Sequence, residues 1–195
     1  GSLIDGDDLL AVVGVDRHQR GLLPGSTVVV TVMANLGLRR ALADHGIAVR
    51  GTAVGDRDVL EALEADGLTL GGEQSGHVIF RDLATTGDGL LTGIQALDAA
   101  RRAGRSLGDR VAELVVRAPQ VLHSVPVVRD GEALVELVAV EVATAAAGLG
   151  DLERVLVRAS GTEPVVRGMG EAFDMERASE VADRLVEAVE RADRT

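Results

Sequence analysis

The sequence predicts an α/β fold: a mixed-sheet α/β domain, followed by a smaller α+β C-terminal domain whose sheet is covered by helices. Two observations lead to this prediction. Between positions 27 and 117, short runs of β-branched residues alternate with helical patterns, as is typical of α/β domains. After Pro119 the pattern changes to extended segments, a polar loop and a long amphipathic helix. We therefore expect two domains, over residues 3–119 and 120–195.

The first domain begins with "IDGDD", where Asp7 and Asp8 are expected to cap a helix and to lie in its first turn. "TVVVTVM" (27–33) is a continuous apolar run, which predicts a strand buried on both faces. A helix should follow and end at Gly46, and residues 47–51 should form the next strand.

The second half of this domain should contain three further helices and two short strands. Asp56 is expected to cap one helix, and Asp88 to cap another that carries Leu90, Leu91, Ile94 and Leu97. The short strands, "LTL" and "HVIF", flank a glycine-rich loop at 71–76. A last helix is expected over roughly 107–116.

The second domain should contain an extended segment at 121–128, a helix at 132–147, and strands at 154–158 and 165–172. The chain then finishes on a helix at 175–192. The apolar residues of that helix recur at helical spacing and define its inner side: Ala178, Val181, Leu185, Val186 and Val189.

Composition excludes several classes of function. The net charge of −11 disfavours nucleic acid and anionic membranes as partners, because both would be repelled. Phe80 and Phe173 are the only aromatic residues, so bases have almost nothing to stack on. Cysteine is absent, which is compatible with a cytoplasmic location, and no apolar run reaches the ~18 residues of a membrane span.

The stretch "RASGTEPVVR" has the composition of a phosphate-binding loop. Arg158 and Arg167 can each donate two parallel hydrogen bonds to phosphate oxygens. Ser160 and Thr162 add hydroxyl donors, and Gly161 lets backbone N–H groups approach an anion. The alternative is a polar hairpin turn with solvated arginines.

The stretch "GGEQSGH" has the composition of a sugar-binding loop. Glu73 can accept hydrogen bonds from neighbouring sugar hydroxyls, and Ser75 can both accept and donate. The alternative is that these are turn residues between two short strands. His77 is the most ambiguous of them, since a histidine at the start of a strand is often structural.

Together the two stretches identify a family. "RASGTEPVVR" resembles the phosphate-binding loop, and "GGEQSGH" the sugar-binding loop, of the α-D-phosphohexomutase superfamily. Gln74 is typical of the phosphoglucosamine mutases within it. "TVMANLGL", "VGDRDVLEAL", "TTGDGLLTG" and "PQVL" also resemble these enzymes and follow in the same order, so the resemblance covers nearly the whole chain.

The resemblance implies that residues 3–119 are the third, sugar-binding domain of such an enzyme and that 120–195 are its fourth, phosphate-binding domain. It assigns the sugar to Glu73, Ser75, Gly76 and His77. It assigns the phosphate to Arg158, Ser160, Gly161, Thr162 and Arg167. Arg57 corresponds to a position that faces the active cleft in the family.

The resemblance also implies what this chain lacks. These enzymes exchange the 6-phosphate and 1-phosphate of a hexose, here glucosamine, through a bisphosphate, using a phosphoserine and a DGDxDR loop that holds Mg²⁺. The sequence contains neither motif. The stretch most similar to the metal loop, "DGDDLLAVV", has leucines where the third Asp and the Arg should stand. We therefore expect no catalytic or metal-binding residue here, Mg²⁺ bound by the part of the enzyme not present, and no turnover by this chain alone.

Two alternatives remain: the corresponding part of a phosphomannomutase or phosphoglucomutase, or a non-catalytic module that binds a sugar phosphate. The sequence also departs from the family at two places. Asp58 stands where an aromatic residue is usual, and Gly168 and Gly170 stand in a strand where branched residues are preferred. Glycine is unfavourable inside strands, so we expect this strand to be weakened.

Overall fold

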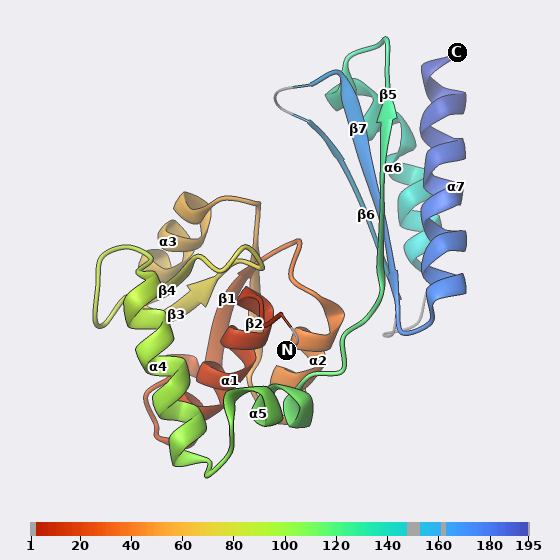
Figure 1. The fold of residues 1–195 in the computed structure, drawn as a ribbon. Helices are drawn as coiled ribbons and strands as arrows, with labels where there is room; N and C mark the ends of the chain where they lie inside the picture. Colours follow the sequence, from red (N-terminus) through yellow and green to blue (C-terminus); the bar gives the residue numbers. More distant parts are fainter. Residues whose placement is uncertain (1–2, 148–152, 161–162, 195) are drawn as a thin grey trace. The chain divides into compact units, whose positions relative to one another are not determined.

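The structure, a computed structural model, describes residues 3–147, 153–160 and 163–194. It divides into two compact units, Gly1–Val116 and Arg117–Thr195. Each unit has a β-sheet of its own with helices packed on it (Figure 1). The expected combination of an α/β unit and a smaller α+β unit is confirmed.

The first unit contains a four-stranded mixed sheet with the strand order β2-β1-β3-β4. Strand β1 pairs in parallel with β2 and with β3, and β4 runs antiparallel to β3. The strands are β1 (Thr27–Thr31), β2 (Ala48–Thr52), β3 (Leu70–Gly72) and β4 (Val78–Phe80). The helices are α1 (Gly6–Gln19), α2 (Leu36–Asp44), α3 (Asp56–Ala65), α4 (Gly89–Arg102) and α5 (Leu107–Leu114), with a short 3₁₀ turn at Pro24–Ser26.

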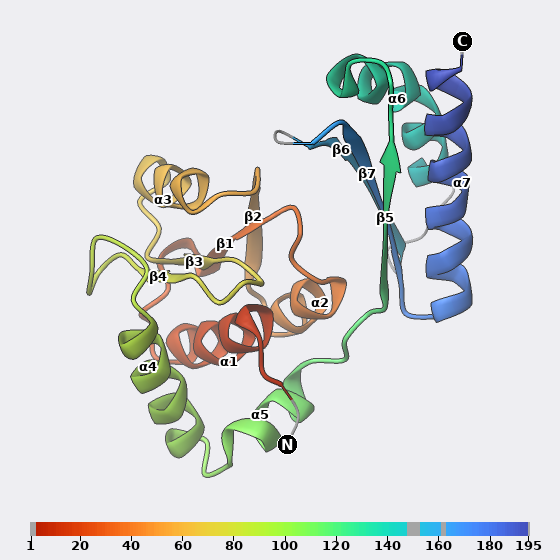
Figure 2. The same cartoon turned by 45° about the horizontal axis from the view of Figure 1, so that its top comes forward.

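Helices cover both faces of this sheet, with α1 and α2 on the opposite side from α3 (Figure 2). Val28 and Val30 of β1 belong to the apolar cluster on the α1 and α2 side. Val29, which points the other way, packs with Val59 and Leu63 of α3. Residues 27–31 of the apolar run therefore form a strand buried on both faces, as predicted, and the chain turns at residues 32–33.

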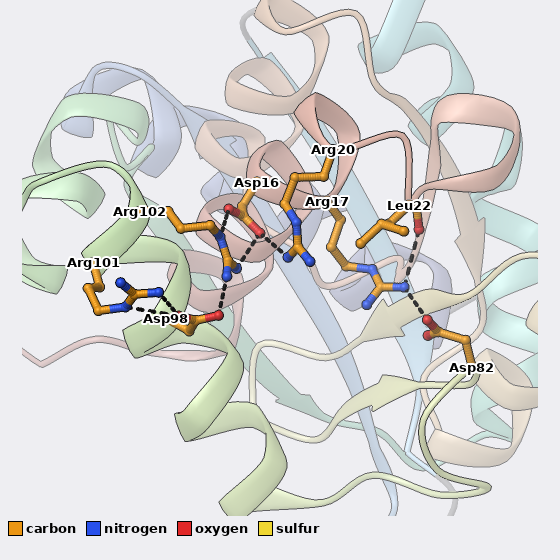
Figure 3. A network of polar contacts seen from close by, with 8 residues as sticks. All are labelled: Asp16, Arg17, Arg20, Leu22, Asp82, Asp98, Arg101 and Arg102. Atoms are coloured by element: carbon orange, nitrogen blue, oxygen red, sulfur yellow. Dashed lines mark hydrogen bonds and ion pairs between the residues drawn. The ribbon is translucent and has the colours of Figure 1, made fainter.

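Ion pairs join α1 to α4 on the outer side of the unit (Figure 3). Arg102 donates to both carboxylate oxygens of Asp16, at 2.8 Å each, and also bonds Asp98. Arg20 adds a bond to Asp16 at 3.0 Å. Burial alone would raise the pKa of Asp16, but the hydrogen bonds from Arg102 and Arg20 outweigh it and lower that pKa. The ion pair between Arg102 and Asp16 therefore holds α4 to α1 while both side chains are charged.

Helix α4 packs mainly through its small side chains. It buries Thr92, Ala96 and two further alanines, because small side chains allow it to lie close to α1. Leu90, by contrast, is 78% exposed, and Ile94 and Leu97 are also exposed. Three of the large apolar residues that predicted the helix, Leu90, Ile94 and Leu97, therefore lie on its outer side, while Leu91 is half-buried against the core of the unit.

The helix starts were predicted with mixed success. Asp88 caps α4, accepting a hydrogen bond from Leu91 N at 2.9 Å, as expected. The cap of α1 is Asp5, with Asp7 and Asp8 in the first turn, so only the first-turn part of that prediction is correct. The expected cap at Asp56 is wrong: Gly55 holds that position at φ 147°, and Asp56 is the first helical residue.

The second unit is a three-stranded antiparallel sheet in the order β5-β7-β6. Its elements are β5 (Gln120–Pro126), α6 (Gly131–Ala147), β6 (Glu153–Ala159), β7 (Val165–Ala172) and α7 (Met175–Asp193). Val125 and Val166 of the sheet share one apolar cluster with Leu134 of α6 and Val189 of α7. Both helices therefore cover the same face of the sheet.

Gly170 explains how α7 packs so closely on β7. A Cβ at this position would lie 2.3 Å from the carbonyl oxygen of Ala178 and 2.7 Å from the nitrogen of Ala182. Only glycine lets the strand and the helix backbone meet at this point. Any loss in strand propensity at Gly170 is thus accompanied by close helix packing.

Candidate functional site

The stretch assigned to a sugar connects β3 to β4. Because β1, β2 and β3 are parallel, the segments that follow them meet at one edge of the sheet, where ligands bind in many α/β proteins. The loop folds back on itself, with Gly76 N donating to Glu73 O at 3.0 Å and Glu73 N donating to His77 O at 3.1 Å. Its shape is therefore set by its own backbone.

Glu73 also contacts the segment that follows β2. Its Oε1 accepts a hydrogen bond from Gly55 N at 3.2 Å, and the side chain is half-buried. A carboxylate has about four acceptor positions, so this bond leaves capacity for a ligand. Ser75, at the tip of the loop, is exposed.

His77 lies at the other end of the loop. Its Nε2 is 3.9 Å from Asp56 Oδ2 at the start of α3, and its ring packs against the backbone of Gly87, next to the cap of α4. The imidazole thus lies close to the starts of two helices, which is consistent with a structural role for this residue as well as with a ligand contact.

Arg57 begins the same helix, α3, but its side chain points along its own helix. Its Nε donates to Glu61 Oε1 at 2.7 Å, and this hydrogen bond raises the pKa of Arg57. The guanidinium is highly exposed. It lies near the loop between β3 and β4, because the neighbouring Gly55 bonds Glu73, but its guanidinium bonds Glu61 rather than that loop.

The stretch assigned to phosphate connects β6 to β7 in the second unit. Arg158 and Arg167 are directly opposite each other in the antiparallel register. Opposite residues in a pair of strands point to the same face, with Cβ atoms ~4.5–5.5 Å apart. The structure thus brings the two arginines together. Ser160 N closes the hairpin by donating to Val165 O at 3.0 Å, while Gly161 and Thr162 lie outside the described residues.

Arg167 has two further neighbours. Its Nη2 donates to Glu163 Oε2 at 3.1 Å, and Ser124 of β5 stands opposite it on its other side. Ser124 therefore lies on the same face as both arginines and is exposed. Sequence reasoning missed it, because only the pairing of β5 with β7 shows which residue adjoins Arg167.

A buried polar row on the same face supports the hairpin. Glu171 is 0% exposed, and it accepts bonds from Arg154 Nε at 2.9 Å, from Arg154 Nη2 at 2.5 Å, and from Gln120 Nε2 at 3.0 Å. The three residues are register partners across β5, β7 and β6. The row ties all three strands together and so helps to hold the alignment of the arginines.

The carboxylates at the start of α1 do not fit a magnesium ion. Asp5 and Asp8 bond each other's backbone in a capping box, and Asp7 Oδ2 accepts from Asn35 N at 2.8 Å. In the described ranges, no three His, Cys, Asp or Glu side chains are grouped so that they could hold a metal. The same residues contain no helix long and apolar enough to cross a membrane.

Family models match both units. Residues 5–118 match "Phosphoglucomutase/phosphomannomutase, alpha/beta/alpha domain III", and residues 110–188 match the C-terminal domain of the same family. The chain belongs to the phosphoglucomutase/phosphomannomutase family. The resemblance seen in the sequence is thereby confirmed.

Curated relatives agree. The chain is 50% identical over 190 residues to a phosphoglucosamine mutase of Thermobifida fusca, and 52% identical over 190 residues to one of Acidothermus cellulolyticus. Each match covers 97% of this chain but only 42% and 41% of the relatives. The chain therefore spans about two fifths of the length of the enzymes it matches.

Solved structures share the fold. A phosphoglucomutase/phosphomannomutase family protein of Burkholderia thailandensis superposes with a TM-score of 0.81 at 23% identity, covering 98% of this chain and 43% of that one. N-acetylphosphoglucosamine mutase of Aspergillus fumigatus, solved with GlcNAc-6P and magnesium, gives 0.75 at 20% identity, covering 98% and 45%.

Proposed function

We propose that this chain is the sugar- and phosphate-binding part of a phosphoglucosamine mutase, which interconverts glucosamine 6-phosphate and glucosamine 1-phosphate through a bisphosphate intermediate. The observation that carries the proposal is the 50–52% identity to enzymes of that name along 97% of the chain. A cytoplasmic location accords with the absence of cysteine.

In this proposal the loop between β3 and β4 recognises the sugar. Glu73 accepts hydrogen bonds from ring hydroxyls while it keeps its bond to Gly55 N. Ser75 and the backbone at Gly76 add further contacts, and His77 lies at the edge of the ligand. Arg57 exchanges its partner Glu61 for the substrate when the site fills.

The hairpin between β6 and β7 recognises the phosphate group. Arg158 and Arg167 clamp it from one face of the sheet, because two adjacent guanidiniums match the charge of a phosphate dianion. Ser160, Gly161 and Thr162 supply hydroxyl and backbone donors. Neither loop touches the bond that breaks, so their effect on the rate comes from positioning the substrate.

We assign the phosphoryl-transferring serine and Mg²⁺ to the part of the enzyme outside this chain, since the carboxylates at the start of α1 accept bonds from backbone N–H groups and no group among the described residues could hold a metal. Magnesium, when bound there, neutralises charge that develops on the transferred phosphoryl group. The residues of this chain bind and orient the hexosamine phosphate.

The proposal is tested with the complete enzyme, Mg²⁺ and a hexose bisphosphate activator. We expect kcat/KM to be highest for glucosamine 6-phosphate, compared with glucose 6-phosphate and mannose 6-phosphate. A preference for mannose or glucose phosphate would favour the corresponding mutase instead. The 195-residue chain alone should show no turnover, and turnover equal to that of the complete enzyme would contradict its assigned role.

A further inference from the structure

The start of α1 lies directly against the backbone of the sugar loop. Gly6 N donates a hydrogen bond to Gln74 O at 3.0 Å. A Cβ at position 6 would lie 2.0 Å from Glu73 O, 2.7 Å from Gly76 N and 3.0 Å from the carbonyl carbon of Gln74. These atoms are all backbone, so no side-chain rotation can make room for a larger residue.

The start of α1 is itself held firmly. Asp5 Oδ1 accepts from Asp7 N at 3.1 Å and from Asp8 N at 3.2 Å, and Asp8 Oδ2 accepts from Asp5 N at 3.2 Å. Asp7 Oδ2 binds the backbone of Asn35 at the start of α2. The stretch that could be mistaken for a metal loop therefore anchors this end of α1.

The loop has a second support in the bond from Gly55 N to Glu73 Oε1. It is thus held both by α1 and by the start of α3. Because the first contact is backbone to backbone, moving Gly6 would move residues 73–76 as a group.

We propose that Gly6 is a positioning residue for sugar recognition, and that the start of α1 determines where Glu73 and Ser75 stand. The inference rests on the proposed function of the sugar loop. In Gly6→Ala the added methyl must displace the loop, and misplacing binding groups by ~1 Å can lower rates about a hundredfold.

The test compares Gly6→Ala with Gly93→Ala in the complete enzyme. A Cβ at Gly93, in α4, would meet no atom within 4 Å, so this control adds the same methyl group without a clash. We expect Gly6→Ala to lower kcat/KM for glucosamine 6-phosphate about tenfold to a hundredfold, mainly through KM. Inhibition by inorganic phosphate should stay unchanged, as should all constants of Gly93→Ala.

A folded Gly6→Ala enzyme with an unchanged KM would overturn the proposal. Glu73→Gln separates this result from failure of the proposed function: if Glu73→Gln weakens sugar recognition while Gly6→Ala does not, only the role of Gly6 is wrong. Normal kinetics in Glu73→Gln would refute the sugar loop, and the role of Gly6 with it.

A second measurement covers the case in which Gly6→Ala does not fold. Hydrogen exchange of the unaltered complete enzyme reports on the Gly6 amide, which bonds Gln74 O. We expect glucosamine 6-phosphate to slow exchange at Gly6 together with residues 73–77, and to leave Gly93 unaffected. Protection of residues 73–77 without any change at Gly6 would contradict the coupling.

Discussion

The two candidate binding segments are held in place in different ways. The sugar loop is supported from outside, by backbone of α1, by Gly55 at the start of α3, and by the packing of His77 on Gly87. The phosphate hairpin depends on its own strands, which place Arg158 opposite Arg167. One site is positioned by elements distant in sequence, and the other by strand register.

This difference bears on how each segment meets a ligand. In the proposed function, Glu73 binds the sugar without giving up its bond to Gly55 N, so its site is ready before the ligand arrives. Arg167 donates to Glu163, so in the proposed function this carboxylate competes with the phosphate for the guanidinium. Like charges placed opposite each other in a sheet are also unfavourable, and a bound dianion would offset this cost at Arg158 and Arg167.

The largest effect should come from removing the row that supports the hairpin. Glu171→Ala removes the buried carboxylate that accepts two hydrogen bonds from Arg154, so we expect the free energy of unfolding of the second unit to fall by about 3 kcal/mol. Urea denaturation, with hydrogen exchange in residues 120–194 as the probe, would measure this loss of stability.

The matched control is Glu180→Ala, which breaks an exposed pair with Arg177 on α7. We expect that change to cost less than about 1 kcal/mol, because exposed pairs contribute little. Equal losses in the two variants would show that the buried row does not stabilise the sheet, and that register alone positions the arginines.

A smaller effect is expected at the phosphate clamp itself. Arg167→Ala should weaken binding of a hexose phosphate by about 1.5–3 kcal/mol, the range for hydrogen bonds to charged groups. Arg167→Lys should recover only part of this, since an ammonium keeps the charge but loses the planar fork. Calorimetry on the complete enzyme would measure both. An Arg167→Ala variant with unchanged affinity would make this residue a solvated arginine of a polar hairpin.

The smallest effect tests whether Arg167 exchanges partners. Glu163 is 61% exposed, and Glu163→Gln weakens its hold on Arg167. Phosphate affinity should therefore rise by about 0.2–1 kcal/mol, which is the strength of an exposed ion pair. The gain should shrink at high salt. Glu187→Gln on α7 changes the net charge equally, and an identical gain there would mean that Glu163 does not compete for Arg167.

The sequence by itself predicted most of the elements, because they depend on local patterns. The apolar run 27–33 predicted a strand buried on both faces, and Asp88 predicted the start of α4. The patterns at 154–158 and 165–172 also predicted strands β6 and β7, and their pairing then places Arg158 and Arg167 on one side. The family resemblance then identified both candidate loops.

Tertiary structure decided which surfaces meet. The outward position of Leu90 depends on neighbours that no local pattern reveals. Ser124 joined the face of the arginines only through the pairing of β5 with β7. Gly6 met Gln74 across a large separation in sequence because α1 packs beside the parallel strands, and such a contact is set by the packing of whole elements.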